Sequence, residues 1–305
     1  MYSHLNDTPR LLLEADLQPV QGTRFQPTGF PDLGAAEFSY GGKSNLLVES
    51  AQSMANRLER AIWDDAAKDV VGPLEGMPYV KTRVEGLGAT SSIEESHRLN
   101  SPYIVKAIEE ELITTLDWNR RIRPDIPALA AYLLKNDPNS LIHGIFFSNI
   151  KPGTLRLPRL LSAFIEADEV TQAASGGVKF DRLDAQGAAK DGKGHVPFHR
   201  VEYTAKSITA YFNLDLHQLR AYRLGAEAEE FLITLALYKI RRFLDYDLRL
   251  RTACDLEVNG IKVKRPAEFN LESQDELGAR LVKQIAALAK AGRFAQPAVR
   301  EVMSK

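Results

Sequence analysis

Every second residue is apolar in two stretches of the chain, residues 10–20 and 207–216. A period of two is typical of a strand with one buried face, and Pro19 ends the first run. The apolar positions are Leu11, Leu13, Ala15 and Leu17 in the first stretch and Ile208, Ala210, Phe212, Leu214 and Leu216 in the second. Both stretches are predicted to be half-buried strands, and residues 141–147 and 160–170 are predicted to be strands as well.

Apolar residues recur at helical spacing over residues 44–64, which are predicted to form a helix. The buried stripe consists of Leu47, Ala51, Met54, Ala55, Leu58 and Ile62, and the opposite face carries Glu49, Gln52, Ser53, Asn56 and Arg60. Because this outer face is rich in amides and hydroxyls, it suggests contact with a polar ligand or a neighbouring subunit. Further helices are predicted near residues 102–117, 127–135, 226–244 and 275–291.

Glycine and proline interrupt the remaining segments, of which residues 65–100 are predicted to be irregular. Residues 171–200 contain five glycines, alternating charges and few apolar anchors, so they are predicted to be an exposed flexible loop. Residues 250–263 are predicted to form a hairpin, because the pair Asn259-Gly260 favours a type I′ turn. The order of elements predicts an α+β protein with helices on one face of an antiparallel sheet.

The composition is that of an ordinary globular protein, with 305 residues, 44% hydrophobic and 26% charged. The net charge is -1, from 39 basic and 40 acidic residues, so any binding of nucleic acid must be local. Cys254 is the only cysteine, which excludes an internal disulfide and predicts a small buried residue on a strand. No run is long and apolar enough for a membrane span, and we expect a cytoplasmic protein without a membrane partner.

Basic and aromatic residues alternate in the loop 171–200, and a similar combination occurs in the tract Gly22–Gly34. Single-stranded RNA requires cations for its phosphates and flat surfaces for its bases. The candidate RNA-binding residues are Arg24, Phe25, Gln52, Ser53, Asn56, Arg57, Gly176, Gly177, Lys179 and Arg182. Two alternatives stay open: a plain solvated loop at 171–200, and structural packing of a helix against a loop for Phe25 and Gln52.

Two histidines of the loop, His195 and His199, offer a different chemistry. Histidine titrates near neutrality, so the pair could act as general acid and base in RNA cleavage. Pro197 separates them and no carboxylate base follows, so we predict neither a metal site nor a catalytic site. Basic clusters at residues 120–123 and 239–251 either face phosphate or pair with nearby acids.

Three segments together resemble one protein family: the tract Gly22–Gly34, the helical run Leu47–Glu59 and the run Ser175–Arg182. They are similar to the RAMP-superfamily, Cas-seven-type backbone subunit of the CRISPR type I-G (formerly I-U) Cascade effector complex, the Csb-one family. The resemblance implies a modified ferredoxin-like, RRM-type palm over residues 1–64, 141–170 and 201–305. It also implies an inserted helical and irregular fingers region at 65–140 and an extended thumb at 171–200.

The function that this resemblance implies is that of a non-enzymatic scaffold without cofactors. Its expected partners are CRISPR RNA, target DNA paired through the guide, other copies of the chain in a helical filament, and the capping, processing and large Cascade subunits. The first alternative is a RAMP-type endoribonuclease that uses His195 or His199. The second is a metabolic α+β enzyme, which would have a closed small-molecule pocket and no affinity for RNA.

Overall fold

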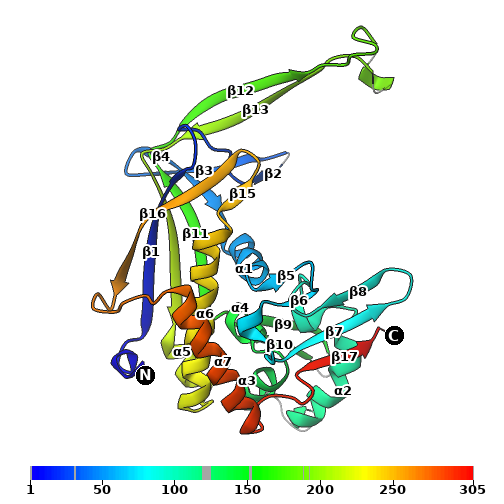
Figure 1. Cartoon of the computed structure of the whole chain (residues 1–305), viewed down its shortest axis with the longest axis vertical. Coiled ribbons are helices and arrows are strands. Elements are labelled where there is room, and N and C mark those ends of the chain that lie inside the picture. Colours follow the sequence, from blue (N-terminus) through cyan, green and yellow to red (C-terminus); the bar gives the residue numbers. More distant parts are fainter. Residues whose placement is uncertain are drawn as a thin grey trace.

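The structure is a computed structural model that describes residues 2–30, 32–118, 125–150, 153–187, 189–191 and 193–304. Strands gather on one side, long helices pack beside them, and one hairpin projects from the rest (Figure 1). The α-helices are α1 (Ala51–Arg60), α2 (Val105–Thr115), α3 (Ile126–Asn136), α4 (Asn139–His143), α5 (Leu216–Ala221), α6 (Ala226–Tyr246) and α7 (Gln274–Lys290). Short 3₁₀ helices cover Ser3–Leu5 (η1), Gly72–Leu74 (η2), Arg98–Asn100 (η3) and Ala189–Asp191 (η5).

The strands are β1 (Arg10–Pro19), β2 (Gly29–Phe30), β3 (Gly34–Tyr40), β4 (Lys43–Glu49), β5 (Trp63–Asp64), β6 (Asp69–Val70), β7 (Tyr79–Val84), β8 (Gly88–Ser91), β9 (Ile145–Ile150), β10 (Gly153–Leu157), β11 (Leu161–Asp168), β12 (Thr171–Lys179), β13 (Val196–Thr204), β14 (Ser207–Asp215), β15 (Arg249–Arg251), β16 (Cys254–Arg265) and β17 (Val299–Met303). Within the described residues, eight of them form one antiparallel sheet in the order β15-β16-β1-β14-β11-β4-β3-β2.

The centre of this sheet has the ferredoxin-like connection. Along the chain, β1, α1, β11, β14, α6 and β16 follow the order β-α-β-β-α-β. In space, β14 lies between the parallel strands β1 and β11, and β1 lies between the parallel strands β14 and β16. Each helix therefore connects two strands that are separated by a third, which is the split βαβ unit. The predicted α+β class with a ferredoxin-like palm is confirmed, and we call this sheet with α1 and α6 the palm.

Among the described residues, the helices that pack on the palm lie on one of its faces (Figure 1). α1 packs against β11 and α6, and α7 packs along α6. Each predicted apolar residue of β1 and β14 is buried on this face, and Phe212 of β14 meets Phe243 of α6 with ring centroids 6.4 Å apart. Cys254 is buried at the start of β16, as expected. Alternation along the two longest predicted strands thus created the core that fixes α6 to the sheet.

Residues 43–49 form a strand, whereas the sequence predicts the first part of a helix over 44–64. β4 pairs with β3 on one side and with β11 on the other. The helix begins after Ser50, whose Oγ accepts a hydrogen bond from the Ser53 N–H at 3.2 Å. In this strand Leu46 and Val48 are buried, Leu47 of the predicted stripe is only half-buried, and Glu49 of the predicted outer face is fully buried. The helical spacing therefore holds only from Ala51 onward. The prediction is confirmed for α1 and wrong at both ends, because residues 44–49 belong to β4 and Trp63–Asp64 form β5.

Asn259 and Gly260 lie inside one continuous strand and not in the predicted type I′ turn. Asp16 pairs with Gly260 and Leu17 pairs with Val258, so Asn259 is the extra residue of a β-bulge in β16. The hairpin turn lies earlier, between β15 and β16. The prediction was wrong because β1 offers β16 a partner along its whole length, and the Asn-Gly pair accommodates a register shift within that pairing.

The region between α1 and β11 contains more regular structure than predicted. Two hairpins, β5–β6 and β7–β8, replace much of the irregular segment at 65–100. β17 joins β7 in parallel, so a strand near the C-terminus completes this small sheet. α2 and α3 confirm two predicted helices, while α4 occupies the first half of the predicted strand 141–147. None of the helices in the described residues combines the length and apolar character that crossing a membrane requires.

Residues 171–200 belong to a long hairpin and not to an irregular loop. β12 and β13 pair continuously from Thr171 with Thr204 to Lys179 with Val196. We call β12, β13 and the segment between them the arm, which extends away from the palm in Figure 1. The predicted exposure is confirmed. The irregular backbone was wrongly predicted, because strand pairing satisfies the backbone hydrogen bonds of this glycine-rich segment without a core beneath it.

Candidate nucleic-acid interface

Tyr203, near the end of β13, fastens the arm to the palm. Its backbone exchanges two hydrogen bonds with Phe25, at 2.9 and 2.8 Å. Its hydroxyl donates to the Glu37 carboxylate of β3, which also accepts from Gln172 of β12 at 2.7 Å. Burial and then Glu37 raise the pKa of Tyr203 to about 12, while these two donors lower the pKa of Glu37. At neutral pH a protonated phenol therefore faces an ionised carboxylate, and this pair fixes the base of the arm.

The structure brings the tract Gly22–Gly34 against the base of the arm. Arg24 is largely exposed and lies 3.4 Å from Glu202 of β13. Phe25 is only 1% exposed, so its ring packs in the core and has no free face for a base. Its position therefore matches the packing alternative. For Arg24, whose guanidinium reaches solvent beside the arm, RNA binding stays a prediction.

A buried carboxylate engages two other candidate residues of α1. Glu49 is fully buried and accepts hydrogen bonds from Ser53 Oγ, from Arg251 of β15 and from Arg57 Nη2 at 2.8 Å. Arg57 also donates to the Leu250 carbonyl at 2.8 Å. The positive charge of Arg57 is thus partly compensated inside the protein. Ser53 and Arg57 join α1 to β4 and β15, and their contact with RNA stays a prediction.

The solvent-facing side of α1 carries the remaining helical candidates. Gln52 and Asn56 are exposed one turn apart, and Arg60 follows one turn later on the same side. Their position agrees with the predicted polar face. Figure 1 shows α1 beside the helical side of the palm, well away from the far end of the arm. The structure therefore does not place Gln52 and Asn56 in one site with Lys179 or Arg182.

The far end of the arm presents Lys179 and Arg182, both exposed, on either side of Asp181. The Asp181 carboxylate accepts backbone hydrogen bonds from Leu183 at 2.9 Å, Asp184 at 3.0 Å and Gly194 at 2.9 Å. These bonds lower the pKa of Asp181. This acid organises the loop by bonding its backbone. The two neighbouring cations extend into solvent, where a polyanion can reach them.

Gly176 and Gly177 allow the two strands of the arm to approach closely. A Cβ added to Gly176 would lie 2.7 Å from the Phe198 carbonyl oxygen, and one added to Gly177 would lie 3.0 Å from the Phe198 ring. Neither glycine adopts a positive φ. The glycines therefore have a structural reason within the arm, and their contact with RNA stays a prediction.

A cavity of about 780 Å³ lies where the arm meets β2 and β3. Its lining includes Thr28, Gly34, Glu37, His199, Arg200 and Arg251. Arg200 stacks on the Phe198 ring with its guanidinium carbon 5.4 Å from the ring centroid. The cavity combines cations, amides and a nearby ring, a composition suited to a polar, anionic ligand. The sequence analysis did not select Arg200, Arg251 or Tyr203 as RNA-binding residues, although Arg200 and Arg251 end the basic segments 171–200 and 239–251.

The two histidines of the arm lie at different points of it. His195 accepts a hydrogen bond from the Asp181 N–H at 3.1 Å through Nδ1, and its ring contacts Phe180 edge-on at 5.2 Å. His199 lies four residues further along β13, beside the cavity at the arm base. Across the described ranges, no group of three or more His, Cys, Asp or Glu side chains could hold a metal ion.

The uncovered face of the palm is a further surface that could stack bases. Phe164 of β11 and Tyr211 of β14 lie opposite each other with ring centroids 5.0 Å apart. Carboxylates flank them, because Glu14 pairs with Tyr211 and Glu166 follows two residues after Phe164. Burial and then the neighbouring Asp168 raise the pKa of Glu166. Phosphates would meet these acids, so the arm side of the palm is the better candidate interface.

Most of the basic cluster at 239–251 is engaged inside the protein. Lys239 is fully buried, Arg241 pairs with Asp245 at 3.5 Å, and Arg242 Nε donates to the Ala61 carbonyl at 2.5 Å. This agrees with the interpretation that these cations have internal partners. The other basic cluster, at 120–123, lies outside the described residues.

Comparison of the chain with known proteins identifies a protein family. Residues 11–172, more than half of the chain, match the model of the family described as CRISPR-associated protein GSU0053. No curated protein matches the chain. A structure titled "CRISPR RNA-guided surveillance complex, pre-nicking" is 13% identical, with 92% of this chain and 89% of that chain covered and a TM-score of 0.47.

Two further solved structures are similar over most of their length. One titled "CRISPR RNA-guided surveillance complex" is 12% identical, covering 93% of this chain and 84% of that one, with a TM-score of 0.42. The crystal structure of Csc2 from Thermofilum pendens is 9% identical, covering 94% and 79%, with a TM-score of 0.32. All three TM-scores are low, so the fold assignment rests on the strand order described above. The family match stands on sequence, and by it the chain belongs to the family of CRISPR-associated protein GSU0053.

Proposed function

We propose that this protein is the CRISPR RNA-binding backbone subunit of a cytoplasmic type I Cascade effector complex, of the I-G subtype. Several copies would bind side by side along the guide RNA in a helical filament and hold it extended for pairing with target DNA. Capping, processing and large subunits would complete the complex. Recognition of the target would come from base pairing, while the protein binds the backbone and shape of the guide.

The arm is the observation that carries this proposal. A two-stranded hairpin without further support is at best marginally stable in water. Beyond its base, this hairpin is covered on neither face by any helix or sheet of the described residues (Figure 1). It exposes cations at Lys179 and Arg182 together with large apolar side chains. Those apolar side chains are Val178, Phe180, Leu183, Val196, Phe198 and Val201. In a CRISPR-associated protein, a guide RNA and a neighbouring copy are the partners that would cover such a surface.

Copurification tests this proposal. The chain would be expressed with its CRISPR array, purified at moderate salt and treated with ribonuclease. We expect retained RNA of uniform length, protein copies in a fixed ratio to it, and release of the RNA at high salt, because phosphate contacts exchange with counterions. The matched variant Lys179→Gln/Arg182→Gln should retain less RNA. A monomer that purifies without RNA under these conditions would rule the proposal out.

We propose further that the protein acts without catalysing a reaction. Neither His195 nor His199 belongs to a described cluster of metal-binding side chains, and the Nδ1 atom of His195 already accepts a backbone hydrogen bond. Incubation with precursor and target RNA, with and without magnesium, should leave both RNAs intact. Cleavage that His199→Ala or His195→Ala abolishes would establish the endoribonuclease alternative instead.

A further inference from the structure

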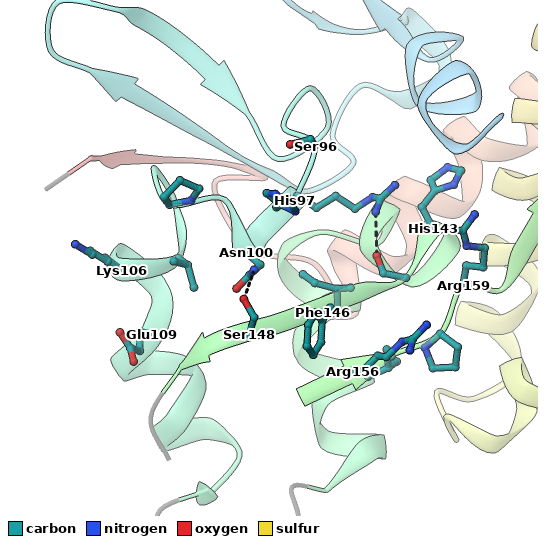
Figure 2. Close-up of a pocket in the computed structure, with 17 residues that line it drawn as sticks. Ser96, His97, Asn100, Lys106, Glu109, His143, Phe146, Ser148, Arg156 and Arg159 are labelled. Atoms are coloured by element: carbon teal, nitrogen blue, oxygen red, sulfur yellow. Dashed lines mark hydrogen bonds between the residues drawn. The ribbon is translucent and has the colours of Figure 1, made fainter. Parts of the chain in front are cut away.

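A second cavity lies outside the palm–arm junction, between η3, α2 and the hairpin β9–β10 (Figure 2). Its volume is about 710 Å³, within the usual size range of small-ligand sites. The side chains that matter for its chemistry are His97, Asn100, Lys106, Phe146, Arg156 and Arg159. None of these residues was predicted from the sequence to bind a ligand.

The lining of this cavity is basic in a chain whose net charge is -1. Among its described lining residues, Glu109 is the one acid, whereas Lys106, Arg156 and Arg159 are cations. Lys106 and Arg156 are exposed, and neither forms an ion pair within the described part of the chain. Burial and then the charge of nearby Arg98 lower the pKa of Arg159. Positive charges thus crowd one wall, and a bound anion would relieve their repulsion.

A flat ring lies beside one of these cations. Phe146 of β9 is directly opposite Arg156 of β10, so both side chains project from the same face of the hairpin. Phe146 is 51% exposed, whereas its neighbours Ile145 and Phe147 are buried on the other face. Figure 2 shows the Phe146 ring and Arg156 together on one side of the cavity. An exposed ring next to a guanidinium is the pair of surfaces that a stacked base and its phosphate require.

The floor of the cavity contains an acceptor without a partner. Asn100 donates through Nδ2 to Ser148 Oγ at 3.3 Å, and its buried Oδ1 has no hydrogen-bond partner within the described residues. This oxygen is sealed from solvent, so it belongs to the wall of the cavity and not to its open surface. The neighbouring Arg98 is held by Glu59 at 2.6 and 2.8 Å and by the Gly144 carbonyl at 3.3 Å, so the wall is fixed in place.

We infer that this cavity binds one nucleotide of a single-stranded nucleic acid. The base would stack on Phe146, and the phosphate would lie between Arg156 and Arg159. This inference rests on the proposed function and deepens it, because it assigns a second contact to the same RNA-binding subunit. An acidic peptide would pair with the cations but would not require the exposed ring of Phe146, so nucleic acid is the better occupant.

Binding of fluorescent single-stranded RNA and DNA of one sequence to the purified full-length protein tests the inference. Phe146→Leu should weaken binding about tenfold, because stacking of one base is lost, and Phe146→Trp should restore it. Arg156→Gln should weaken binding and reduce the slope of log K against log salt by about one. The matched control is Arg83→Gln, an exposed strand arginine outside the cavity, which should bind like the wild type.

The outcomes separate this inference from the proposed function. Wild-type binding with no change in Phe146→Leu and Arg156→Gln would overturn the cavity and leave the proposed function standing. Absence of any nucleic-acid binding by the wild type would overturn both. If polyglutamate displaced the bound probe from the cavity and an unlabelled oligonucleotide did not, the cavity would bind an acidic protein segment, and the inference would be overturned. A larger effect of the variants on RNA than on DNA identifies the guide as the source, and the reverse identifies the target strand.

Discussion

The palm and the arm are both built from antiparallel strands, but they use their side chains in different ways. On the helix-covered face of β1 and β14, alternate residues are buried, and they pack against α6. In the arm, side chains of both faces of β12 and β13 are exposed, including Val178 at 46% and Phe198 at 47%. The palm is therefore stabilised from within, whereas the arm depends on its attachment at Tyr203 and on partners.

Charged side chains form a buried, paired cluster in the palm, whereas cations of the arm are exposed. In the palm, Glu49 is fully buried against Arg57 and Arg251, so its charge contributes to stability. In the arm, Lys179 and Arg182 are exposed, so their charges are free to act on a ligand. The comparison teaches that mutations in the palm should change unfolding, while mutations in the arm should change binding and leave unfolding nearly unaltered.

Truncation of one aromatic ring in each region is the strongest test of this difference. Phe212→Ala removes a ring that is 2% exposed and packs on Phe243, and we expect the free energy of unfolding to fall by about 4 kcal/mol. Phe198→Ala should change it by no more than about 0.5 kcal/mol, because the ring is largely exposed. Urea unfolding measures the free energy of unfolding of both variants. When RNA retention is measured on the folded proteins, it should fall for Phe198→Ala and not for Phe212→Ala. Equal losses of stability would remove the distinction between palm and arm.

The buried carboxylate of the palm provides the next largest effect. Glu49→Ala leaves the guanidinium groups of Arg57 and Arg251 without their buried acceptor, and we expect a loss of about 3 kcal/mol in the free energy of unfolding. The matched variant is Glu202→Ala at the arm base. Glu202 is 8% exposed, but its partners Arg24 at 3.4 Å and Arg200 at 3.9 Å reach solvent after its loss, so we expect a cost of about 1 kcal/mol. Chemical unfolding checks both values. A Glu49→Ala protein as stable as the wild type would mean that solvent already screens this cluster.

A pH titration distinguishes a buried charge from exposed ones. Lys239 in α6 lies 2.9 Å from His143 Nε2, and burial lowers its pKa from 10.5 to about 7. Above pH 7 the unfolded chain keeps a proton on this lysine that the folded protein has released. Stability should therefore rise by about 2 kcal/mol from pH 7 to pH 9, and the same amount is lost as the pH returns to 7.

The variant Lys239→Met should abolish this rise, whereas Lys193→Met in the arm, where Lys193 is exposed, should preserve it. The rise in stability between pH 7 and pH 9 lies below the pH range in which Cys254 changes the free energy of unfolding, because burial raises the pKa of that thiol from 9.0 to about 11. Urea unfolding at intervals of half a pH unit gives the slope. An unchanged slope in Lys239→Met would assign the pH dependence to another group.

Long periodic segments made much of the palm predictable from sequence. β1, β14 and α7 were predicted because each buries one side against a large core, which gives a clear period of two or of 3.6. α6 was predicted as a long apolar run, and its residues from Phe231 to Ile240 are buried on all sides. The sequence could not separate β4 from α1, since both bury apolar residues and only Ser50 marks the boundary. It also mistook the bulge at Asn259 for a turn, because the partner strand β1 is distant in sequence.

The residues of the candidate site were less predictable than the fold, because burial and long-range pairing decide which side chains are free. Composition identified the arm and Arg24 as exposed and basic, but burial decides whether a chosen side chain is free, and Phe25 is not. The cavity with Phe146 and Arg156 depends on a cross-strand register that no local pattern reveals. Side-chain chemistry is local in sequence, whereas a binding surface is assembled by long-range pairing.

The smallest predicted effect concerns one methyl group in the arm. Gly176→Ala places a Cβ 2.7 Å from the Phe198 carbonyl oxygen, so β12 and β13 must move apart locally. We expect the free energy of global unfolding to change by less than about 0.5 kcal/mol, because no core lies beneath the arm. Amide hydrogen exchange in β12 and β13 should accelerate about tenfold, and Ser175→Ala, which already has a Cβ, should not alter it.

RNA retention by the same variant decides between the two roles of this glycine. If exchange accelerates and retention of the guide falls, the close packing of the strands shapes the surface that binds RNA. If exchange is unchanged and retention falls, the backbone of Gly176 itself approaches the phosphates. If exchange accelerates and retention is unchanged, the glycine serves only the arm, and the contacts with RNA lie at its cations and rings. Because the palm is unaffected in each case, the result reports on the arm alone.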